Sequence, residues 1–283
     1  MRVLVLGANG MLGNAMLRVM SEQDGWTAYG TVRSPNISLQ KLAPRATLIQ
    51  GVRADQSDSL MAAFIQSRPQ VVINCIGLVK QLASAEDPLE AIPINSVLPH
   101  RLAKLCELVQ ARLIHISTDC VFSGRKGNYC ESDFADAQDL YGRSKLIGEV
   151  GYRHAITLRT SIIGHELEGS HGLIDWFLSQ QDCVKGYTEA IFSGLPTCEL
   201  AKVIRDFVIP DPGLWGLYHV AAAPISKYDL LHIVDREYGK NLQIEPDNKV
   251  RIDRSLDASR FREASGYVAP AWPDLIAQMR RFC

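Results

Sequence analysis

Tyr141 and Lys145 place a phenol and an ammonium group four residues apart. The segment between them reads as helical, so both side chains are expected on one face, one turn apart. A cation beside a tyrosine stabilises the phenolate and lowers the pKa of the phenol. We therefore predict that Tyr141 acts as a general acid/base near neutral pH. Upstream, Ser117-Thr118-Asp119 ends a predicted strand and supplies a hydroxyl that can hold a carbonyl oxygen.

A glycine-rich turn lies near the start of the chain, directly after an apolar run. The first glycine permits a tight turn, the second lets the backbone come close to a pyrophosphate, and the third lets a helix pack closely on a strand. The phosphates would meet free N–H groups at a helix N-terminus, which favours anions. The turn predicts a dinucleotide site formed by Gly7, Asn9, Gly10, Met11, Leu12 and Gly13.

The residues after the second predicted strand indicate which dinucleotide is preferred. An acidic residue there would bind a ribose 2′-hydroxyl, but this chain has Arg33 and Ser34. A guanidinium suits a 2′-phosphate, so NADPH is favoured over NADH. Asp55, after the third predicted strand, is expected near the adenine; alternatively it caps the helix that begins at Ser57.

Short β-branched runs alternate with amphipathic stretches in the first half of the chain, as in βαβ units. The predicted strands are apolar, as buried parallel strands should be, and span Val3–Leu6, Thr27–Val32, Thr47–Gln50, Val71–Cys75, Leu113–Ser117 and Ile156–Arg159. Helices are predicted at Met11–Met20, Ser57–Gln66, Pro88–Gln110 and Leu140–Tyr152. We expect an α/β fold of the Rossmann type, a doubly wound parallel sheet with helices on both faces and ligands at the carboxyl ends of its strands.

The regular alternation ends after Gly164, where prolines begin to separate shorter elements. Further helices are predicted at Leu173–Gln181, Cys198–Val208, Lys227–Tyr238 and Trp272–Arg281. We predict an NAD(P)-binding domain at residues 1–164, completed by residues near 192–222. Residues 165–283 are expected to form mainly a small α/β lobe that binds the substrate.

Two segments carry a specific resemblance to a known family. Residues 117–124 read S-T-D-C-V-F-S-G, and residues 141–149 read Y-G-R-S-K-L-I-G-E. They resemble the S-T-D-Y-V-F-x-G and Y-G-x-S/T-K-L-x-G-E patterns of the dTDP-4-dehydrorhamnose reductase family, which belongs to the extended short-chain dehydrogenase/reductases. The Gly-x-x-Gly-x-x-Gly spacing of the turn is similar to the same class. The likeness is dense from Met1 to about Gly164 and looser through Phe192–Thr197.

The resemblance implies an NAD(P)H-dependent reductase of the 4-keto group of a nucleotide-linked 6-deoxyhexose, in the synthesis of sugars for surface polysaccharides. Thr118 would hydrogen-bond the ketone oxygen, Tyr141 would deliver its proton, and Lys145 would orient the nicotinamide ribose. The hydride would come from the cofactor. The resemblance also implies cofactor contacts from Cys75, Ile76 and Gly77, and substrate contacts from Lys80, Asp119, Cys120, Ser161 and Arg254.

Departures from the pattern keep other activities open. Cys120 replaces the family's tyrosine, and Lys80-Gln81 differs from the typical reductase, so a different sugar is conceivable. A 4,6-dehydratase is disfavoured because such enzymes resemble T-D-E at this point, where the chain has Cys120. A nucleotide-sugar epimerase remains an alternative. So does a non-catalytic NADP-binding subunit that regulates a partner enzyme, although the complete set of Thr118, Tyr141 and Lys145 favours an enzyme.

The composition excludes several classes of protein. Thirty basic residues face thirty-one acidic ones, and no run of cations is long enough to bind a polyanion, so nucleic acid is an unlikely partner. No apolar run approaches the ~20 residues that span a bilayer. Seven scattered cysteines without a C-x-x-C pair argue against a disulfide framework and a metal site. We expect a cytoplasmic protein that forms a homodimer, with a nucleotide sugar as its substrate.

Overall fold

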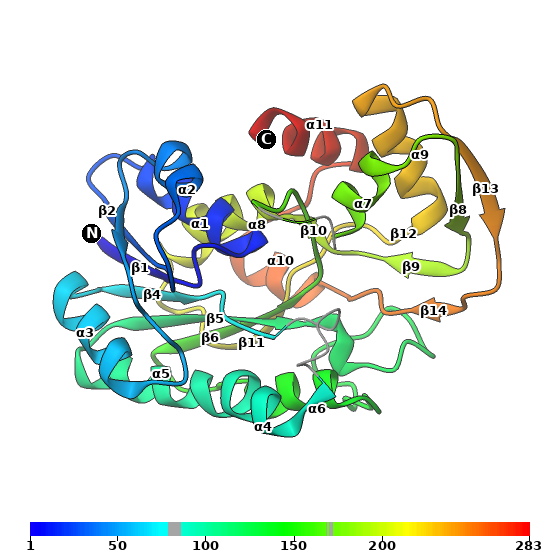
Figure 1. The fold of residues 1–283 in the computed structure, drawn as a ribbon. Helices are drawn as coiled ribbons and strands as arrows, with labels where there is room; N and C mark the ends of the chain where they lie inside the picture. The colour runs from blue at the N-terminus through cyan, green and yellow to red at the C-terminus, as the bar shows by residue number, and fades with distance from the viewer. Residues whose placement is uncertain (79–85, 168, 170–171) are drawn as a thin grey trace.

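The computed structural model describes residues 1–78, 86–167, 169 and 172–283. Its centre is a seven-stranded sheet with the strand order β11-β6-β5-β4-β1-β2-β3, in which every pairing is parallel (Figure 1). This arrangement confirms the predicted doubly wound fold. The strands are β1 Arg2–Leu6, β2 Thr27–Thr31, β3 Thr47–Ile49, β4 Val71–Asn74, β5 Arg112–Thr118, β6 Ala155–Thr160 and β11 Gly216–His219.

Helices cover both faces of the sheet, as Figure 1 shows. One face carries α1 Met11–Ser21, α8 Thr197–Val203 and α11 Trp272–Phe282, and the other carries α3 Ser57–Ser67, α5 Leu98–Leu108 and α6 Leu140–Ile147. Successive side chains of a strand point to opposite faces. Accordingly, Val3 and Val5 of β1 pack into one hydrophobic cluster, whereas Leu4 and Leu6 pack into the other. A continuous apolar strand therefore supplies two cores.

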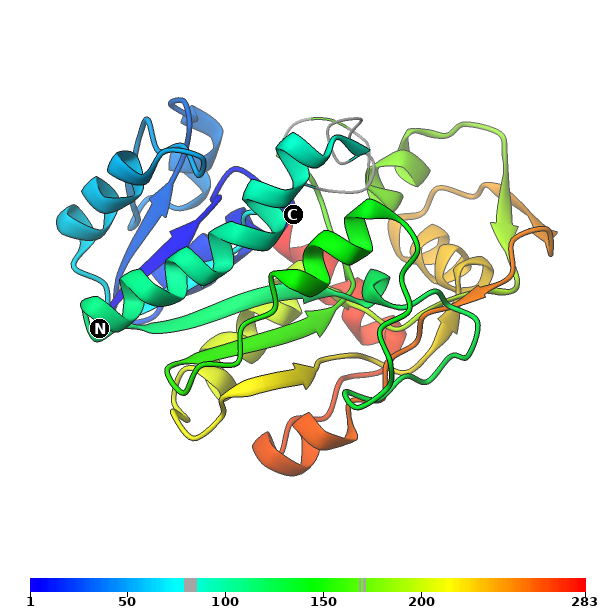
Figure 2. The same cartoon turned by 90° about the horizontal axis from the view of Figure 1, so that it is seen from below.

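The predicted helix Pro88–Gln110 is not uniform. It consists of α4 Pro88–Ala91, a π-helical segment η2 Ile92–Val97, and α5, which ends at Leu108. Pro93 has no N–H to donate in the helix interior, and a π-helical turn accommodates the missing bond. Seen from below in Figure 2, this helical stretch runs beside α6.

The predicted helix Leu140–Tyr152 was too long, because α6 ends at Ile147 and Gly148 caps it. A Cβ on Gly148 would lie 1.9 Å from the Asn95 carbonyl oxygen, so this glycine lets α6 approach η2 closely. The short helix α2 Ile37–Leu42, whose cap Asn36 accepts a hydrogen bond from Leu39, was not predicted. A weak six-residue helix offers little periodicity to detect.

The second half of the chain both completes the sheet and builds a smaller lobe. Strand β11 extends the central sheet beside β6, and α8 packs against α1. The further elements of this half are β7 Ile162–Ile163, α7 Leu173–Ser179, β8 Cys183–Tyr187, β9 Ala190–Phe192, β10 Leu195–Pro196, η4 Ile204–Val208, β12 Ile225–Ser226, α9 Lys227–Tyr238, β13 Gln243–Asp247, β14 Ile252–Asp253 and α10 Ser259–Ser265. Within the described residues, their strands form three small sheets with the orders β10-β7, β12-β9-β14 and β13-β8.

Candidate active site

The glycine turn after β1 has a different physical requirement at each glycine. Gly7 has φ +80°, and a Cβ there would lie 2.9 Å from the Cγ1 atom of Ile76. A Cβ on Gly13 would lie 2.0 Å from the Gly7 carbonyl oxygen, so only glycine lets α1 pack against the turn. At Gly10, however, the nearest heavy atom to a Cβ is 3.5 Å away. The space over Gly10 is therefore open to a ligand, which fits a pyrophosphate.

The N-terminus of α1 faces the same space. Gly10 is its cap residue and has no side chain, and the first helical residues Met11 and Leu12 leave N–H groups free of intrahelical partners. The Leu12 side chain is buried in the core, whereas Asn9 is exposed in the turn. Met11 and Leu12 can therefore serve an anion through their backbone rather than their side chains.

The next part of the cofactor edge is the end of β4. Cys75 donates its N–H to the Leu6 carbonyl at 3.1 Å, which continues the sheet beyond β4. A Cβ on Gly77 would lie 3.8 Å from the Lys145 ammonium nitrogen, so this backbone passes directly beside the lysine. Together with Ile76 against Gly7, these contacts place the predicted residues Cys75, Ile76 and Gly77 between the glycine turn and Lys145.

Arg33 and Ser34 follow β2 and are exposed at the same edge. Asp55 is also exposed, and its carboxylate forms an ion pair with Arg53 at 3.0 Å. The hydrogen bond from Arg53 is the main reason that the pKa of Asp55 lies below its usual value, and Arg33 contributes to the same shift. The alternative prediction, that Asp55 caps the helix beginning at Ser57, is wrong. Gln56 occupies the N-cap position of α3.

Thr118, Tyr141 and Lys145 come together from two elements. Thr118 is the last residue of β5 and caps the short 3₁₀ helix η3 Asp119–Val121. Tyr141 lies in the first turn of α6 and shares a side-chain hydrogen bond with Thr118. Lys145, one turn later, is buried and donates to the Ile116 carbonyl at 2.7 Å. The three groups therefore meet at the carboxyl edge of the sheet.

A glycine and a cap position this helix. Asp139 accepts a hydrogen bond from the Gly142 N–H at 2.7 Å and thereby fixes the start of α6. A Cβ on Gly142 would lie 2.2 Å from the Cys120 carbonyl oxygen. Glycine at this position thus lets α6 lie against η3, which brings Tyr141 to Thr118.

The expected lowering of the tyrosine pKa by Lys145 is not found. Burial is the main cause that raises the pKa of Tyr141 above its ordinary value, and the hydrogen bond with Thr118 only partly opposes this. Burial lowers the pKa of Lys145 to about 8, against the opposing effects of Glu149 and Cys75. Tyr141 is accordingly a protonated group near neutral pH, suited to donate a proton rather than to remove one.

Asn95 is a site residue that the sequence analysis missed. Its side chain is buried on η2, accepts from the Leu78 N–H at 2.9 Å and donates to the Ser144 hydroxyl at 3.1 Å. It therefore links the backbone after β4 to the helix that carries Tyr141 and Lys145. An asparagine on the inner face of an amphipathic helix, two residues after Pro93, was the available signal.

Charged groups lie beside the predicted catalytic residues on the lobe side. Asp119 is buried and accepts from the Thr118 hydroxyl at 3.2 Å. Arg254 donates to the Phe122 carbonyl at 2.8 Å and approaches the Cys120 sulfur at 3.8 Å. Burial raises the pKa of Asp119, while Arg254 and, more weakly, Lys227 oppose that shift. Asp119, Cys120 and Arg254 thus lie together, as predicted substrate residues would.

Lys227 was not predicted as a site residue. It is the first residue of α9, and burial lowers its pKa while Asp119 and Cys120 act in the opposite direction. Its distance in sequence from both residues leaves no local pattern that would have identified it. An open hollow of about 690 Å³ is lined by residues of the 123–125, 188–191 and 251–253 segments, and its charged side chains are Arg125, Glu189, Arg251 and Asp253.

Two predicted substrate residues differ in what the structure shows of them. Ser161 follows β6, in which Thr160 is paired with Thr118, and its carbonyl accepts from Leu195 at 2.9 Å. Ser161 therefore lies at the same sheet edge as the predicted catalytic residues. Lys80 lies outside the described residues.

In the described part of the chain, no group of three or more His, Cys, Asp or Glu side chains is arranged to hold a metal ion.

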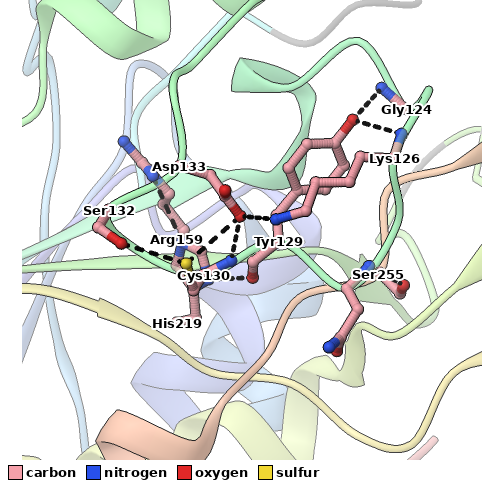
Figure 3. Close-up of polar contacts among 10 residues, drawn as sticks. Gly124, Lys126, Tyr129, Cys130, Ser132, Asp133, Arg159, His219 and Ser255 are labelled. Atoms are coloured by element: carbon pink, nitrogen blue, oxygen red, sulfur yellow. Dashed lines mark hydrogen bonds and ion pairs between the residues drawn. The ribbon is translucent and has the colours of Figure 1, made fainter.

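Polar contacts of Tyr129 hold the loop between η3 and α6, as Figure 3 shows. The Tyr129 hydroxyl accepts hydrogen bonds from the N–H groups of Gly124 and Lys126, at 3.2 and 3.0 Å. Its carbonyl pairs with the His219 ring of β11 at 3.0 Å, and His219 in turn contacts Arg159 of β6 at 3.4 Å. The loop that leads to Tyr141 is thus fixed to β11 and, through His219, to β6, at one edge of the central sheet.

Comparison with curated proteins finds several relatives. The chain is 28% identical over 233 residues to a probable low-salt glycan biosynthesis reductase of Haloferax volcanii, covering 78% of this chain and 75% of that protein. It is 27% identical over 237 residues to dTDP-4-dehydrorhamnose reductase of Mycobacterium tuberculosis, covering 75% and 73%. It is 29% identical to methionine adenosyltransferase 2 subunit beta of Rattus norvegicus, covering 59% of this chain but only 48% of that subunit.

Solved structures share the fold over the whole chain. The dTDP-4-dehydrorhamnose reductase of Bacillus anthracis, solved in complex with NADP, superposes with a TM-score of 0.80 at 20% identity, covering 100% of this chain and 99% of that one. The sequence model of the RmlD substrate binding domain family matches residues 1–264. This match and the relatives found by sequence confirm the resemblance seen in the motifs. The chain belongs to the RmlD substrate binding domain family.

Proposed function

We propose that this protein is an NAD(P)H-dependent reductase that acts on the 4-keto group of a nucleotide-linked 6-deoxyhexose. The observation that carries the proposal is the convergence of Thr118, Tyr141 and Lys145 beside a glycine turn that fits a pyrophosphate. The relatives named as reductases support the same activity. Surface-polysaccharide sugar synthesis is the pathway class that such a reaction serves.

Each catalytic side chain has a role that its surroundings favour. Thr118 holds the ketone oxygen through its hydroxyl, and Tyr141 donates its phenolic proton to that oxygen as the alcohol forms. Burial keeps Tyr141 protonated, which suits this direction of transfer. Lys145 orients the hydroxyls of the nicotinamide ribose, beside Gly77. When bound, the cofactor supplies the hydride.

We infer that the cofactor and the substrate occupy different parts of the chain. Residues 1–164, completed by residues near 192–222, bind NADPH in preference to NADH through Arg33 and Ser34. Residues 165–283 mainly contribute the substrate lobe. There Arg254, Lys227 and Asp119 surround the sugar next to Cys120, with Ser161 and Lys80 as further contacts. The hollow takes the nucleotide end through Arg125, since a guanidinium group suits its phosphates, whereas Arg251 is paired with Glu189 in the same lining.

An assembly and a location are also proposed. Leu89, Ile92 and Ile147 are 83%, 42% and 62% exposed on α4, η2 and α6, elements that contact one another. We propose that a second copy of the chain covers this apolar face in a homodimer. Within the described residues, no helix has the length and apolar character to cross a membrane. Cytoplasmic location is the corresponding proposal.

The test is NADPH oxidation, followed by absorbance, with a panel of 4-keto-6-deoxy nucleotide sugars. The native protein is compared with Tyr141→Phe, which removes the proton donor and keeps the ring. Turnover in the native protein that collapses in the variant supports the reductase and identifies the nucleotide. Turnover that is equal in both proteins would remove Tyr141 from the mechanism.

A second candidate is a non-catalytic NADP-binding subunit that regulates a partner enzyme. The similarity to a methionine adenosyltransferase subunit is the observation in its favour, although the chain spans only about half the length of that relative. The two candidates separate in the same experiment. Tight NADPH binding without NADPH oxidation by any keto sugar in the panel would count against the reductase and favour the subunit or an epimerase.

A further inference from the structure

Two arginines leave the sheet next to each other at its cofactor edge. The pairing of β2 and β3 continues past both strands, with Val32 donating to the Ile49 carbonyl at 3.0 Å and Val52 donating to the Val32 carbonyl at 3.1 Å. Gly51, with φ +73°, forms the intervening bulge. The residues that follow the paired valines are Arg33 and Arg53. Backbone pairing therefore brings the backbones of Arg33 and Arg53 next to each other.

Arg53 is held by interactions on both its backbone and its side chain. Its N–H donates to the Ser59 hydroxyl at 3.0 Å, and its carbonyl accepts from the same hydroxyl at 2.8 Å. Ser59 lies in the first turn of α3, so the loop is tied to a helix. The guanidinium contacts the Asp55 carboxylate at 3.0 Å. Arg53 is thus an exposed cation whose backbone is tied to α3 and whose guanidinium is paired with Asp55.

This pair of cations adjoins the glycine turn. Thr31, the last residue of β2, accepts from the Gly7 N–H through its side chain at 3.1 Å and from the Ala8 N–H through its carbonyl at 3.0 Å. In doubly wound folds the adenosine ribose lies at the end of this second strand. Arg33 is two residues beyond Thr31, so both arginines lie where the ribose 2′ position is expected.

The local charge suits a phosphate group. Asp55 is the carboxylate that acts most strongly on Arg53, and Glu90 acts on it more weakly. Arg33 is near enough to Asp55 to lower the pKa of its carboxyl group, together with Arg53. A guanidinium binds a phosphate through paired hydrogen bonds, whereas a 2′-hydroxyl offers it no charge. The arrangement therefore discriminates between phosphorylated and unphosphorylated ribose.

We propose that Arg53, fixed by Asp55 and Ser59, is a second determinant of NADPH preference and binds the adenosine 2′-phosphate together with Arg33. This inference rests on the proposed NADPH site. It adds Arg53, a residue after β3 that lies outside both the glycine turn and the end of β2. Asp55 then acts by positioning Arg53, and its cofactor role is indirect.

The experiment measures binding by calorimetry, without any sugar substrate. Native protein, Arg53→Ala and Arg33→Ala are titrated with adenosine 2′,5′-bisphosphate and with adenosine 5′-monophosphate, and then with NADPH and NADH. Arg45→Ala is the matched control, because Arg45 is similarly exposed and pairs with Asp24 at 3.5 Å at the other end of β3. Melting curves establish that each variant is folded.

Arg53→Ala is expected to weaken the bisphosphate and NADPH about tenfold, the effect of one lost hydrogen bond to a charged group. Binding of the monophosphate and NADH should change less than about twofold, and Arg45→Ala should change nothing. If Arg53→Ala and the native protein show the same ratio of bisphosphate affinity to monophosphate affinity, Arg53 does not bind the 2′-phosphate, and the NADPH preference still stands.

If the native protein binds the bisphosphate and the monophosphate equally well, both the NADPH preference and the role of Arg53 are wrong. Reduction of a keto sugar with NADH would in that case still support the reductase.

Discussion

Gly10→Ala should separate the phosphate site from the packing of the fold. Gly10 has φ −73° and ψ 162°, which alanine adopts without strain, and its added methyl group would meet nothing closer than the Gly7 carbonyl oxygen at 3.5 Å. Replacing glycine at a compatible position changes stability by ~1 kcal/mol or less. The melting temperature should therefore stay within about 4 °C of the native value.

Binding should change far more than stability. The methyl group would occupy the space above the turn, where the pyrophosphate approaches the backbone and the N-terminus of α1. Loss of one hydrogen bond to a charged oxygen costs about 1.5–3 kcal/mol, which weakens binding about ten- to hundredfold. NADPH affinity is measured by the change in its fluorescence on titration. The same titration on Gly151→Ala, where an added Cβ has no neighbour within 4 Å, is the silent control.

Gly13→Ala provides the opposite case. Its Cβ would lie 2.0 Å from the Gly7 carbonyl oxygen and 2.8 Å from the Gly7 carbonyl carbon, which are backbone atoms that cannot rotate away. Overpacking of this kind costs about 1–3 kcal/mol, so stability and binding should fall together. Native NADPH affinity in Gly10→Ala would refute the proposed path of the pyrophosphate, and a strongly destabilised Gly10→Ala would refute the geometry of the turn.

Three further outcomes are expected. Tyr141→Phe should lower kcat by about 10²–10⁴ and leave the NADPH dissociation constant within about twofold, since the ring is kept; a loss in affinity alone would contradict proton donation. The kcat/KM of the native protein should fall as pH rises through about 8, because Lys145 then loses its charge while Tyr141, whose pKa is raised, keeps its proton; a constant profile to pH 10 or so would contradict this assignment. Glu149→Gln should lower the free energy of unfolding by ~3–5 kcal/mol in a urea titration, because it leaves Arg159, 4% exposed, without its carboxylate at 2.7 Å. Glu107→Gln is the control, because Glu107 forms an exposed ion pair with Lys104 and its loss should change the urea midpoint little; an equal loss of stability in both variants would contradict the role of the buried pair.

The strands were predictable because their burial leaves a continuous apolar signal. Val71–Cys75 and Leu113–Ser117 are buried on both faces, so the sequence there contains few polar residues, and the predicted ranges differ from β4 and β5 by at most one or two residues at each end. The glycine turn was also predictable from the sequence, because the three glycines follow an apolar strand and open a helix. These features depend on neighbours in sequence, which a single chain displays directly.

The ends of helices and several site residues depend instead on distant neighbours. Gly148 ends α6 where the helix meets Asn95, more than fifty residues earlier in the chain. Arg53 gains its importance from pairing with the strand that leads to Arg33, and Lys227 from approaching Asp119. The direction of the Tyr141 pKa shift was wrong for the same reason. The spacing to Lys145 predicted a lowered pKa, but burial of the phenol raises it.

The position of α6 connects these observations. Gly142 and Gly148 both lack the Cβ that would collide with a carbonyl oxygen, of Cys120 in one case and of Asn95 in the other. The helix is therefore held between the turn that follows Thr118 and the π-helical segment beside Leu78. Because both neighbours are backbone, the helix cannot shift without breaking one contact. The spacing between Tyr141 and Lys145 sets their relative direction, but these two glycines set where the pair lies at the carboxyl edge of the sheet.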